Sequence, residues 1–283
     1  MTLDDLALDA LSERLVQVPG IVGVMLGGSR ARGDHTPDSD VDLGLYYDTS
    51  LGTELDVTAL AAVARDVAGP DITLTGPGEW GPWVDGGGWL RIEGIAVDWI
   101  YRDLARVRRS WATARAGHFA FHFQHGHPLG VPDFSYAGEV ALGRVLADPS
   151  GQLTALRAET RQYPPALAEE LVRKLSAASF LVGVARKAVP RGDATYVAGC
   201  LFQVVGSCCH ALHGRAGRWT VNEKGLVASA GRLPIAPAGF ADRAHAVLSG
   251  LSSDPARLAA ALDRAASLVA QTDDACRSAR SRA

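Results

Sequence analysis

The chain has 283 residues, of which 47% are hydrophobic and 21% are charged, and its formal net charge is −3. This length suits two domains of ordinary size or one large domain, and the composition excludes a chain that is disordered throughout. The small negative charge offers no basic footprint for long nucleic acid, so a small-molecule partner is favoured.

The termini and the cysteines predict a cytoplasmic protein. The first residues, MTLDDLALDALSERL, are acidic and amphipathic, which is unlike a signal peptide. No stretch approaches 18 uninterrupted apolar residues, so no membrane partner is expected. Free thiols are then expected at the four cysteines, which are Cys200, Cys208, Cys209 and Cys276. The sequence does not predict an oligomeric state.

Helices and strands alternate in the first hundred residues. Leucines at helical spacing predict a helix over residues 2–18, which ends at Pro19-Gly20. The same reasoning predicts a helix over residues 54–68. Short apolar stretches predict strands over residues 21–26, 40–47, 72–75, 89–92 and 95–101, the last two as a hairpin.

A pair of aspartates begins the second predicted strand. Asp40 and Asp42 are two residues apart, so on a strand their side chains share one face, with Val41, Leu43 and Leu45 on the other. Two carboxylates at the edge of a buried core form a site of hard oxygen ligands. Such a site suits Mg²⁺.

A glycine turn precedes this strand. Gly27 and Gly28 allow a tight turn and a close approach of the backbone to a ligand. Ser29 is expected to start a short helix, and the free N–H groups at a helix N-terminus favour a triphosphate. Phosphate binding and metal binding at this separation are what nucleotidyl transfer requires.

The stretch from Gly27 to Leu43 resembles the signature of the DNA polymerase β-like nucleotidyltransferase superfamily. Leu26-Gly27-Gly28 supplies its glycine element, and Asp40-Val41-Asp42-Leu43 supplies its metal-binding element. The fuller string Gly-Ser-Arg-Ala-Arg-Gly is similar to the minimal branch and to the aminoglycoside and lincosamide nucleotidyltransferases. The resemblance implies a nucleoside triphosphate, ATP in the first instance, and two Mg²⁺ ions.

A third carboxylate is expected from Asp98, in the apolar strand Ala-Val-Asp-Trp-Ile-Tyr. An acid is costly to bury there without a partner. The resemblance implies that Asp98 joins Asp40 and Asp42 as a catalytic metal ligand. The alternative is an acid on a solvated face of the sheet.

Cationic residues should assist the triphosphate. Arg30 and Arg32 flank the glycine turn, and the resemblance suggests that Lys224, from the C-terminal half, contacts the triphosphate. Arg191-Gly192-Asp193 is a weaker candidate that an interhelix turn explains equally well. The acids considered as general base besides Asp98 are Glu139, Glu169 and Glu170.

The remaining segments predict a change of architecture near residue 150. Four histidines, His118, His122, His125 and His127, lie in a segment whose alternation favours a half-buried strand over a zinc site. Helices are predicted over residues 136–146, 167–188, 195–212 and 255–270. The expected fold is an α/β (α+β) nucleotidyltransferase sheet domain over residues 1–150 and an all-helical domain over residues 151–283.

These observations favour a metal-dependent nucleotidyltransferase that moves a nucleoside monophosphate to a hydroxyl of a small, antibiotic-like acceptor and releases pyrophosphate. Trp80, Trp83 and Trp89 either line an acceptor pocket or pack in the core. Two alternatives stay open: the acceptor is a protein or a tRNA, as in toxin or antitoxin nucleotidyltransferases, or the protein is a nucleotide-binding sensor without turnover.

Overall fold

The computed structural model describes residues 5–33, 35–36 and 38–280. The chain divides into two compact units. Unit 1 runs up to Thr113 and resumes over His122–Gln162. Unit 2 comprises Ala114–Phe121 and the residues from Tyr163 onward.

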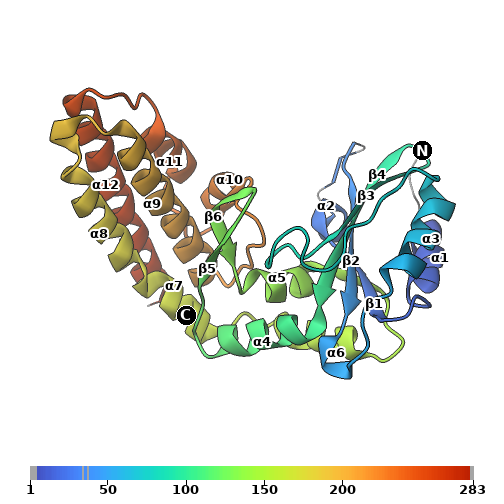
Figure 1. Cartoon of the computed structure of the whole chain (residues 1–283). Coiled ribbons are helices and arrows are strands. Elements are labelled where there is room, and N and C mark those ends of the chain that lie inside the picture. The colour runs from blue at the N-terminus through green and yellow to red at the C-terminus, as the bar shows by residue number, and fades with distance from the viewer. Residues whose placement is uncertain (1–4, 34, 37, 281–283) are drawn as a thin grey trace. The chain divides into compact units, whose positions relative to one another are not determined.

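Unit 1 is built on a five-stranded mixed sheet with the order β3-β4-β2-β1-β7 (Figure 1). β2 and β4 are parallel, and the other neighbours are antiparallel. The mixed sheet, together with the helices of unit 2, confirms the expected fold class. The strands are β1 (Ile21–Leu26), β2 (Val41–Tyr47), β3 (Gly87–Ile92), β4 (Ile95–Asp103) and β7 (Arg144–Ala147).

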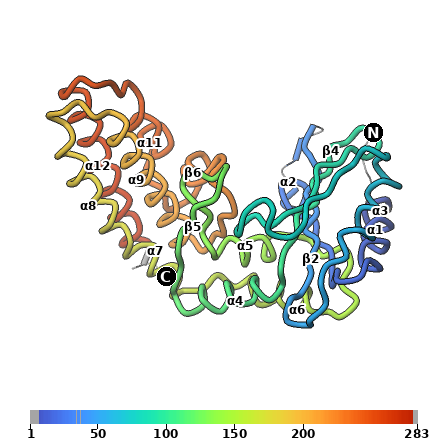
Figure 2. Tube along the Cα trace, in the orientation of Figure 1, coloured from blue at the N-terminus to red at the C-terminus, as the bar shows by residue number. Residues whose placement is uncertain are grey.

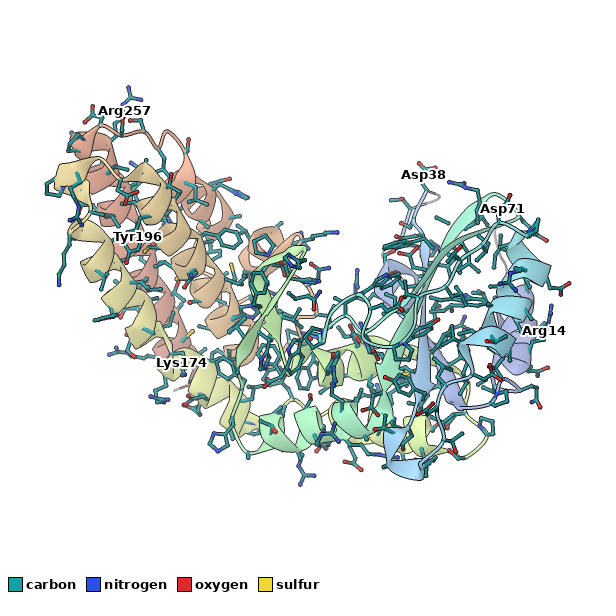
Figure 3. All side chains as sticks on the ribbon, in the orientation of Figure 1. Arg14, Asp38, Asp71, Lys174, Tyr196 and Arg257 are labelled. Atoms are coloured by element: carbon teal, nitrogen blue, oxygen red, sulfur yellow. The ribbon has the colours of Figure 1, made fainter. Side chains whose placement is uncertain are left out.

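One face of this sheet packs in the main core of the unit. α1 (Asp5–Leu15) and α3 (Val57–Ala68) cover it, and an ion pair between Arg14 and Asp66 joins the two helices at the surface (Figure 3 labels Arg14). The predicted apolar positions of β2 are all buried in this core: Val41, Leu43 and Leu45. The first residues of the helix predicted over 2–18 lie outside the described residues.

Three predicted elements differ from the structure. The single helix predicted over residues 167–188 is divided at Lys174 into α7 (Pro165–Arg173) and α8 (Leu175–Arg186). Residues 72–75 form no strand, because only Thr75 bonds to Gly87 at the sheet edge before Pro77, which has no N–H to donate. The helix predicted over residues 136–146 is shorter, α5 (Ser135–Leu142). It stops at Gly143, and the chain then adds β7 along the free edge of β1.

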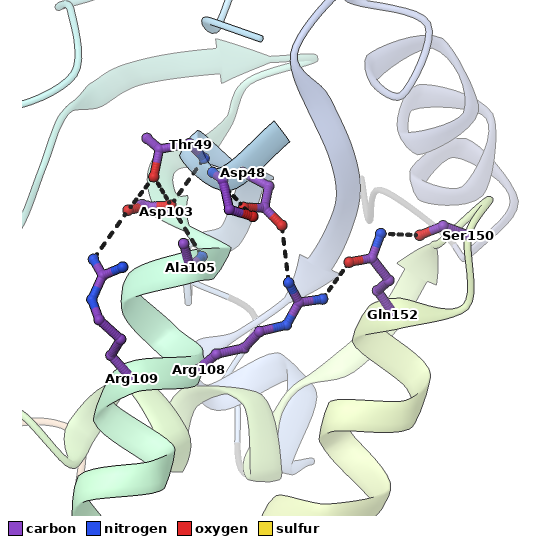
Figure 4. A network of polar contacts seen from close by, with 9 residues as sticks. Asp48, Thr49, Asp103, Ala105, Arg108, Arg109, Ser150 and Gln152 are labelled. Carbon is purple, nitrogen blue, oxygen red and sulfur yellow. Dashed lines mark hydrogen bonds and ion pairs between the residues drawn. The ribbon is translucent and has the colours of Figure 1, made fainter. Parts of the chain in front are cut away.

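A polar network joins the sheet to two helices at the ends of β2 and β4 (Figure 4). Arg108, on α4 (Leu104–Arg115), donates to Asp48 and also to Gln152, on α6 (Gln152–Thr160). α6 buries Leu153 and Leu156 within unit 1, so this unit extends past residue 150. The hairpin of β5 (Phe121–Gln124) and β6 (His127–Pro132) occupies the histidine segment.

Unit 2 is helical, and α9 is its central helix, packed by α7, α8 and α12 (Figure 2). Cys208 and Cys209 are buried on α9, and all four cysteines are free thiols, as predicted. Tyr196 and Lys174 lie at the surface of the unit (Figure 3). The helices are α7 (Pro165–Arg173), α8 (Leu175–Arg186), α9 (Ala194–Arg215), α10 (Leu226–Gly231), α11 (Phe240–Leu248) and α12 (Pro255–Arg280).

α9 is also, among the described helices, the one whose length and composition would let it cross a membrane. However, 61% of its most apolar window is buried inside the protein. Buried core helices meet the same criterion, so α9 is weak grounds for a membrane span.

Candidate active site

Three aspartates meet on the face of the sheet opposite the main core. β2 and β4 run in parallel with Asp42 directly beside Asp98, and Asp40 lies one residue before the start of β2. One carboxylate oxygen from each of the three lies within 4.8 Å of the others. The predicted convergence of these residues is therefore present, and strand register is what produces it.

The negative charge of these carboxylates is poorly offset by hydrogen-bond donors in the described part of the chain. No donor among the described residues makes a hydrogen bond to the side chain of Asp42 or Asp98. Burial, together with the negative charges of Asp40 and Asp98, raises the pKa of Asp42 to about 6. Burial and Asp40 also raise the pKa of Asp98. Converging carboxylates in this state fit a divalent cation with oxygen ligands, such as Mg²⁺, which would neutralise their mutual repulsion.

The glycine turn packs directly against one of these acids. The N–H of Gly27 donates to the carbonyl of Asp42 at 2.8 Å, which extends the pairing of β1 with β2 beyond Leu26. Gly28 has a φ of +58°, and a Cβ atom there would lie 1.8 Å from Oδ2 of Asp42. Glycine is thus required at position 28 by the carboxylate itself, a reason that adds to the predicted approach of a ligand.

The turn leads into α2 (Gly28–Arg32), in which Ser29 is the second residue. Arg30 donates from Nε to the carbonyl of Asp40 at 3.0 Å and from Nη2 to that of Ser39 at 2.8 Å. It therefore holds the loop that positions Asp40. Arg32 is exposed, and its charge lowers the pKa of Asp42, opposing the effect of the neighbouring acids.

An ion pair on the same face of the sheet was not anticipated from the sequence. Arg102 lies four residues after Asp98 on β4, and its guanidinium forms two hydrogen bonds with Glu139 on α5, at 2.6 and 2.8 Å. The negative charge of Glu139 raises the pKa of Asp42. The even spacing of positions 98, 100 and 102 could have placed Arg102 on the acid face. Nothing in the sequence pairs it with Glu139.

The tryptophans lie in two groups. Trp80 stacks on Trp89 with ring centroids 4.4 Å apart, and Trp89 is paired with Asp98 in the β3–β4 ladder. Trp83 stacks on His122 at 3.6 Å. Within the described part of the chain, the aspartates form the one group of side chains able to hold a metal, and no histidine belongs to it.

The other candidates lie in unit 2. Lys224 is exposed in the turn before α10, where its backbone N–H donates to Asn222. Glu169 pairs with Arg215, and Glu170 pairs with Arg173. The side chain of Asp193 accepts from the N–H of Tyr196 at the start of α9, as an interhelix turn requires.

One comparison with known proteins includes residues of this site. Residues 7–69 match the family profile described as "Nucleotidyltransferase domain", a segment that includes the glycine turn, Asp40 and Asp42. No curated protein matches the chain in sequence. Similar solved structures include a nucleotidyltransferase-like protein from Exiguobacterium sibiricum 255-15, with 14% identity and a TM-score of 0.45, over 94% of this chain and 74% of that one.

Proposed function

We propose that this chain, which carries a nucleotidyltransferase domain of the DNA polymerase β-like superfamily, transfers a nucleoside monophosphate from ATP to a hydroxyl of a small-molecule acceptor. One observation carries the proposal. Three carboxylates converge within 4.8 Å beside a glycine turn, and no described residue donates a hydrogen bond to the side chains of Asp42 and Asp98. Such an arrangement is costly for stability and useful for binding a cation.

Asp40, Asp42 and Asp98 would hold the metal, two Mg²⁺ ions in the full complex. When bound, Mg²⁺ would neutralise charge on the phosphates as it develops during transfer. Gly27 and Gly28 would let the backbone approach the triphosphate closely, and Arg32 adds positive charge beside Asp42. Lys224 stays a candidate for a further contact with the triphosphate.

In the reaction, the acceptor oxygen forms a bond to the α-phosphorus, and the bond from that phosphorus to pyrophosphate breaks. The hydroxyl proton passes to a base. Asp98 is the candidate, because it lies beside Asp42 in the β2–β4 pairing, at the proposed metal site where the acceptor oxygen reacts. Glu139 is less suited, because both of its oxygens already accept from Arg102.

A small acceptor is favoured over a tRNA because the chain has a formal net charge of −3. An aminoglycoside- or lincosamide-like compound is the acceptor class to try first, given the similarity of the motif. A protein acceptor, or a sensor without turnover, is the competing hypothesis.

The proposal is tested by incubating the purified chain with Mg²⁺ and each α-³²P-labelled nucleoside triphosphate. Separate reactions contain aminoglycosides and lincosamides, purified proteins, or tRNA. Label on a small molecule with stoichiometric pyrophosphate, absent for Asp42→Asn, supports the proposal. Label on protein or tRNA instead supports the competing acceptors. Tight nucleotide binding without pyrophosphate in every reaction would contradict catalysis.

A further inference from the structure

We infer that the stacked indoles of Trp80 and Trp89 form a platform that binds a ring of the acceptor, so that the acceptor is a cyclic compound with a flat apolar face. This inference rests on the proposed function. It concerns side chains of unit 1 only and depends on where the sheet register places them.

Trp89, Asp98 and Asp42 form one row across three neighbouring strands. Asp42 pairs with Asp98 between β2 and β4, and Asp98 pairs with Trp89 between β4 and β3. Residues paired in this way point to the same face of a sheet, and neighbouring strands lie about 4.8 Å apart. Trp89 therefore flanks the carboxylate that we propose as the acceptor of the hydroxyl proton.

The two ends of this row differ in the kind of ligand that they suit. The glycine turn and α2 lie on the β1 side of Asp42, where the positive charge of Arg32 favours phosphates. Trp89 lies on the other side, beyond Asp98. Its indole carries no charge. The Trp89 side of the row therefore suits the uncharged part of an acceptor rather than a triphosphate.

The indole of Trp89 is placed for stacking. Trp80 lies nearly parallel to it, with 20° between the ring planes, and yet 69% of Trp89 is exposed. The core-facing residue next to it on β3, Leu90, is buried. A ring that is mostly outside the core gains little from folding beyond its contact with Trp80, and its exposed part can stack on the flat C–H or aromatic face of a ligand.

The segment that carries Trp80 is held rigidly. Gln124 donates from Nε2 to the carbonyl of Trp80 at 2.6 Å, and the N–H of Trp80 donates to the carbonyl of Asp85. The buried carboxylate of Asp85 accepts in turn from the Tyr47 hydroxyl and from the N–H of Gly78, both at 2.8 Å. A preformed platform loses little conformational freedom when a ligand binds.

The test compares Trp89→Ala with Trp89→Phe and with a matched control, Phe123→Ala. Phe123 is also an exposed aromatic residue of unit 1, 80% exposed on β5, but it is not part of the row. Ring probes are kanamycin and lincomycin, with saturated rings, and salicyl alcohol, with an aromatic ring. Glycerol is the hydroxyl compound without a ring. Binding of each is measured by calorimetry without nucleotide, and transfer is measured by steady-state kinetics.

We expect the wild type to bind at least one ring probe more tightly than glycerol. Trp89→Ala should weaken that binding and raise the acceptor KM by about tenfold, while the KM for ATP stays unchanged. Trp89→Phe should recover most of the loss, and Phe123→Ala should equal the wild type. The saturated and aromatic probes then show which kind of ring the platform prefers.

Two results would overturn the inference: no ring probe binds more tightly than glycerol, or Trp89→Ala binds the rings and the acceptor as well as the wild type does. Failure of the proposed function is a separate result. If ring binding depends on Trp89 but no nucleotide is transferred, the inference about the platform is supported and the proposed nucleotidyl transfer is contradicted.

Discussion

Aspartates lie toward both ends of the paired strands β2 and β4, but the hydrogen bonding of their carboxylates differs. At one end, Asp48 and Asp103 are surrounded by donors. Asp48 accepts from Arg108 and from the N–H and hydroxyl of Ser50, and Asp103 accepts from Thr49 (Figure 4). At the other end, Asp42 and Asp98 face one another with no such donors among the described residues.

The difference separates acids that stabilise the fold from acids that are available for a ligand. A buried carboxylate with several donors contributes to stability, because its charge is compensated within the protein. Converging carboxylates without donors raise the free energy of the folded state, as the raised pKa of Asp42 indicates. We infer that their compensation comes from a bound cation.

The largest effect is expected from Asp42→Asn or Asp98→Asn. Each change removes a proposed metal ligand, so nucleotidyl transfer should fall by about 10³-fold or more. The melting temperature of the metal-free protein should stay constant or rise, because one repelling charge is lost. Kinetics and calorimetry on the same preparation measure the rate of transfer and the melting temperature. If either variant turns over as fast as the wild type in saturating Mg²⁺, the substituted residue is not a metal ligand in the reaction.

The second effect is expected from Gly28→Ala. The new Cβ would collide with Oδ2 of Asp42, so the carboxylate must move, and a displacement of about 1 Å can cost about 100-fold in rate. Gly33→Ala is the matched control at the other end of α2. Its φ is +77°, but no atom lies within 4 Å of the added Cβ. Both variants should lose about 1 kcal/mol of stability, and only Gly28→Ala should lose activity. Equal activities in the two would show that Gly28 does not position Asp42.

The third effect is a loss of stability at the end of β2 and β4 where Asp48 and Asp103 accept several hydrogen bonds. Asp48→Ala removes the buried partner of Arg108 and the cap of the short 3-10 turn at Thr49–Leu51, so the free energy of unfolding should fall by about 2–3 kcal/mol. Urea denaturation measures this. The kcat of the remaining folded protein should be unchanged. A variant that is as stable as the wild type would mean that the network in Figure 4 contributes little.

The smallest effect is a dependence of stability on pH. The pKa of Asp42 is raised from 3.8 to about 6 in the folded protein, so the folded state holds a proton that the unfolded state releases. This contribution to stability is complete below pH 3.8 and is lost as the pH rises through 6. The shift corresponds to about 3 kcal/mol at most, and solvent screening at this partly exposed carboxylate reduces the loss. Thermal melts of the metal-free wild type and of Asp42→Asn between pH 4 and 8 measure this contribution of Asp42 as the difference between the two proteins. If the difference between the two proteins does not change with pH, Asp42 titrates normally.

The sequence predicted what depends on spacing alone. Alternation placed Asp42 opposite Val41 and Leu43. An acid within an apolar strand drew attention to Asp98, and the family resemblance implied that it joins the pair. These inferences needed only the period of a strand and the cost of burying a charge. The row that joins Asp42, Asp98 and Trp89 depends on the strand order and register, which no local pattern encodes.

Long-range contacts also decided the roles of other residues. The prediction that Arg30 assists the triphosphate stays a prediction, and the structure adds that Arg30 donates to two carbonyls of the loop before β2. Gly28 accommodates a carboxylate from another strand. Gly143 ends α5, so that β7 can pair with β1. In each case the partner lies outside the local sequence window, so the contact could not be predicted from that window.

The central claim is that the uncompensated aspartates bind a divalent cation. Its most direct test is the binding of Mn²⁺, followed by the loss of the free-ion signal in electron paramagnetic resonance, for the wild type, the double variant Asp42→Asn/Asp98→Asn, and Asp48→Ala. The account predicts saturable binding by the wild type and by Asp48→Ala, and none by the double variant. Equal Mn²⁺ binding by all three proteins would contradict it.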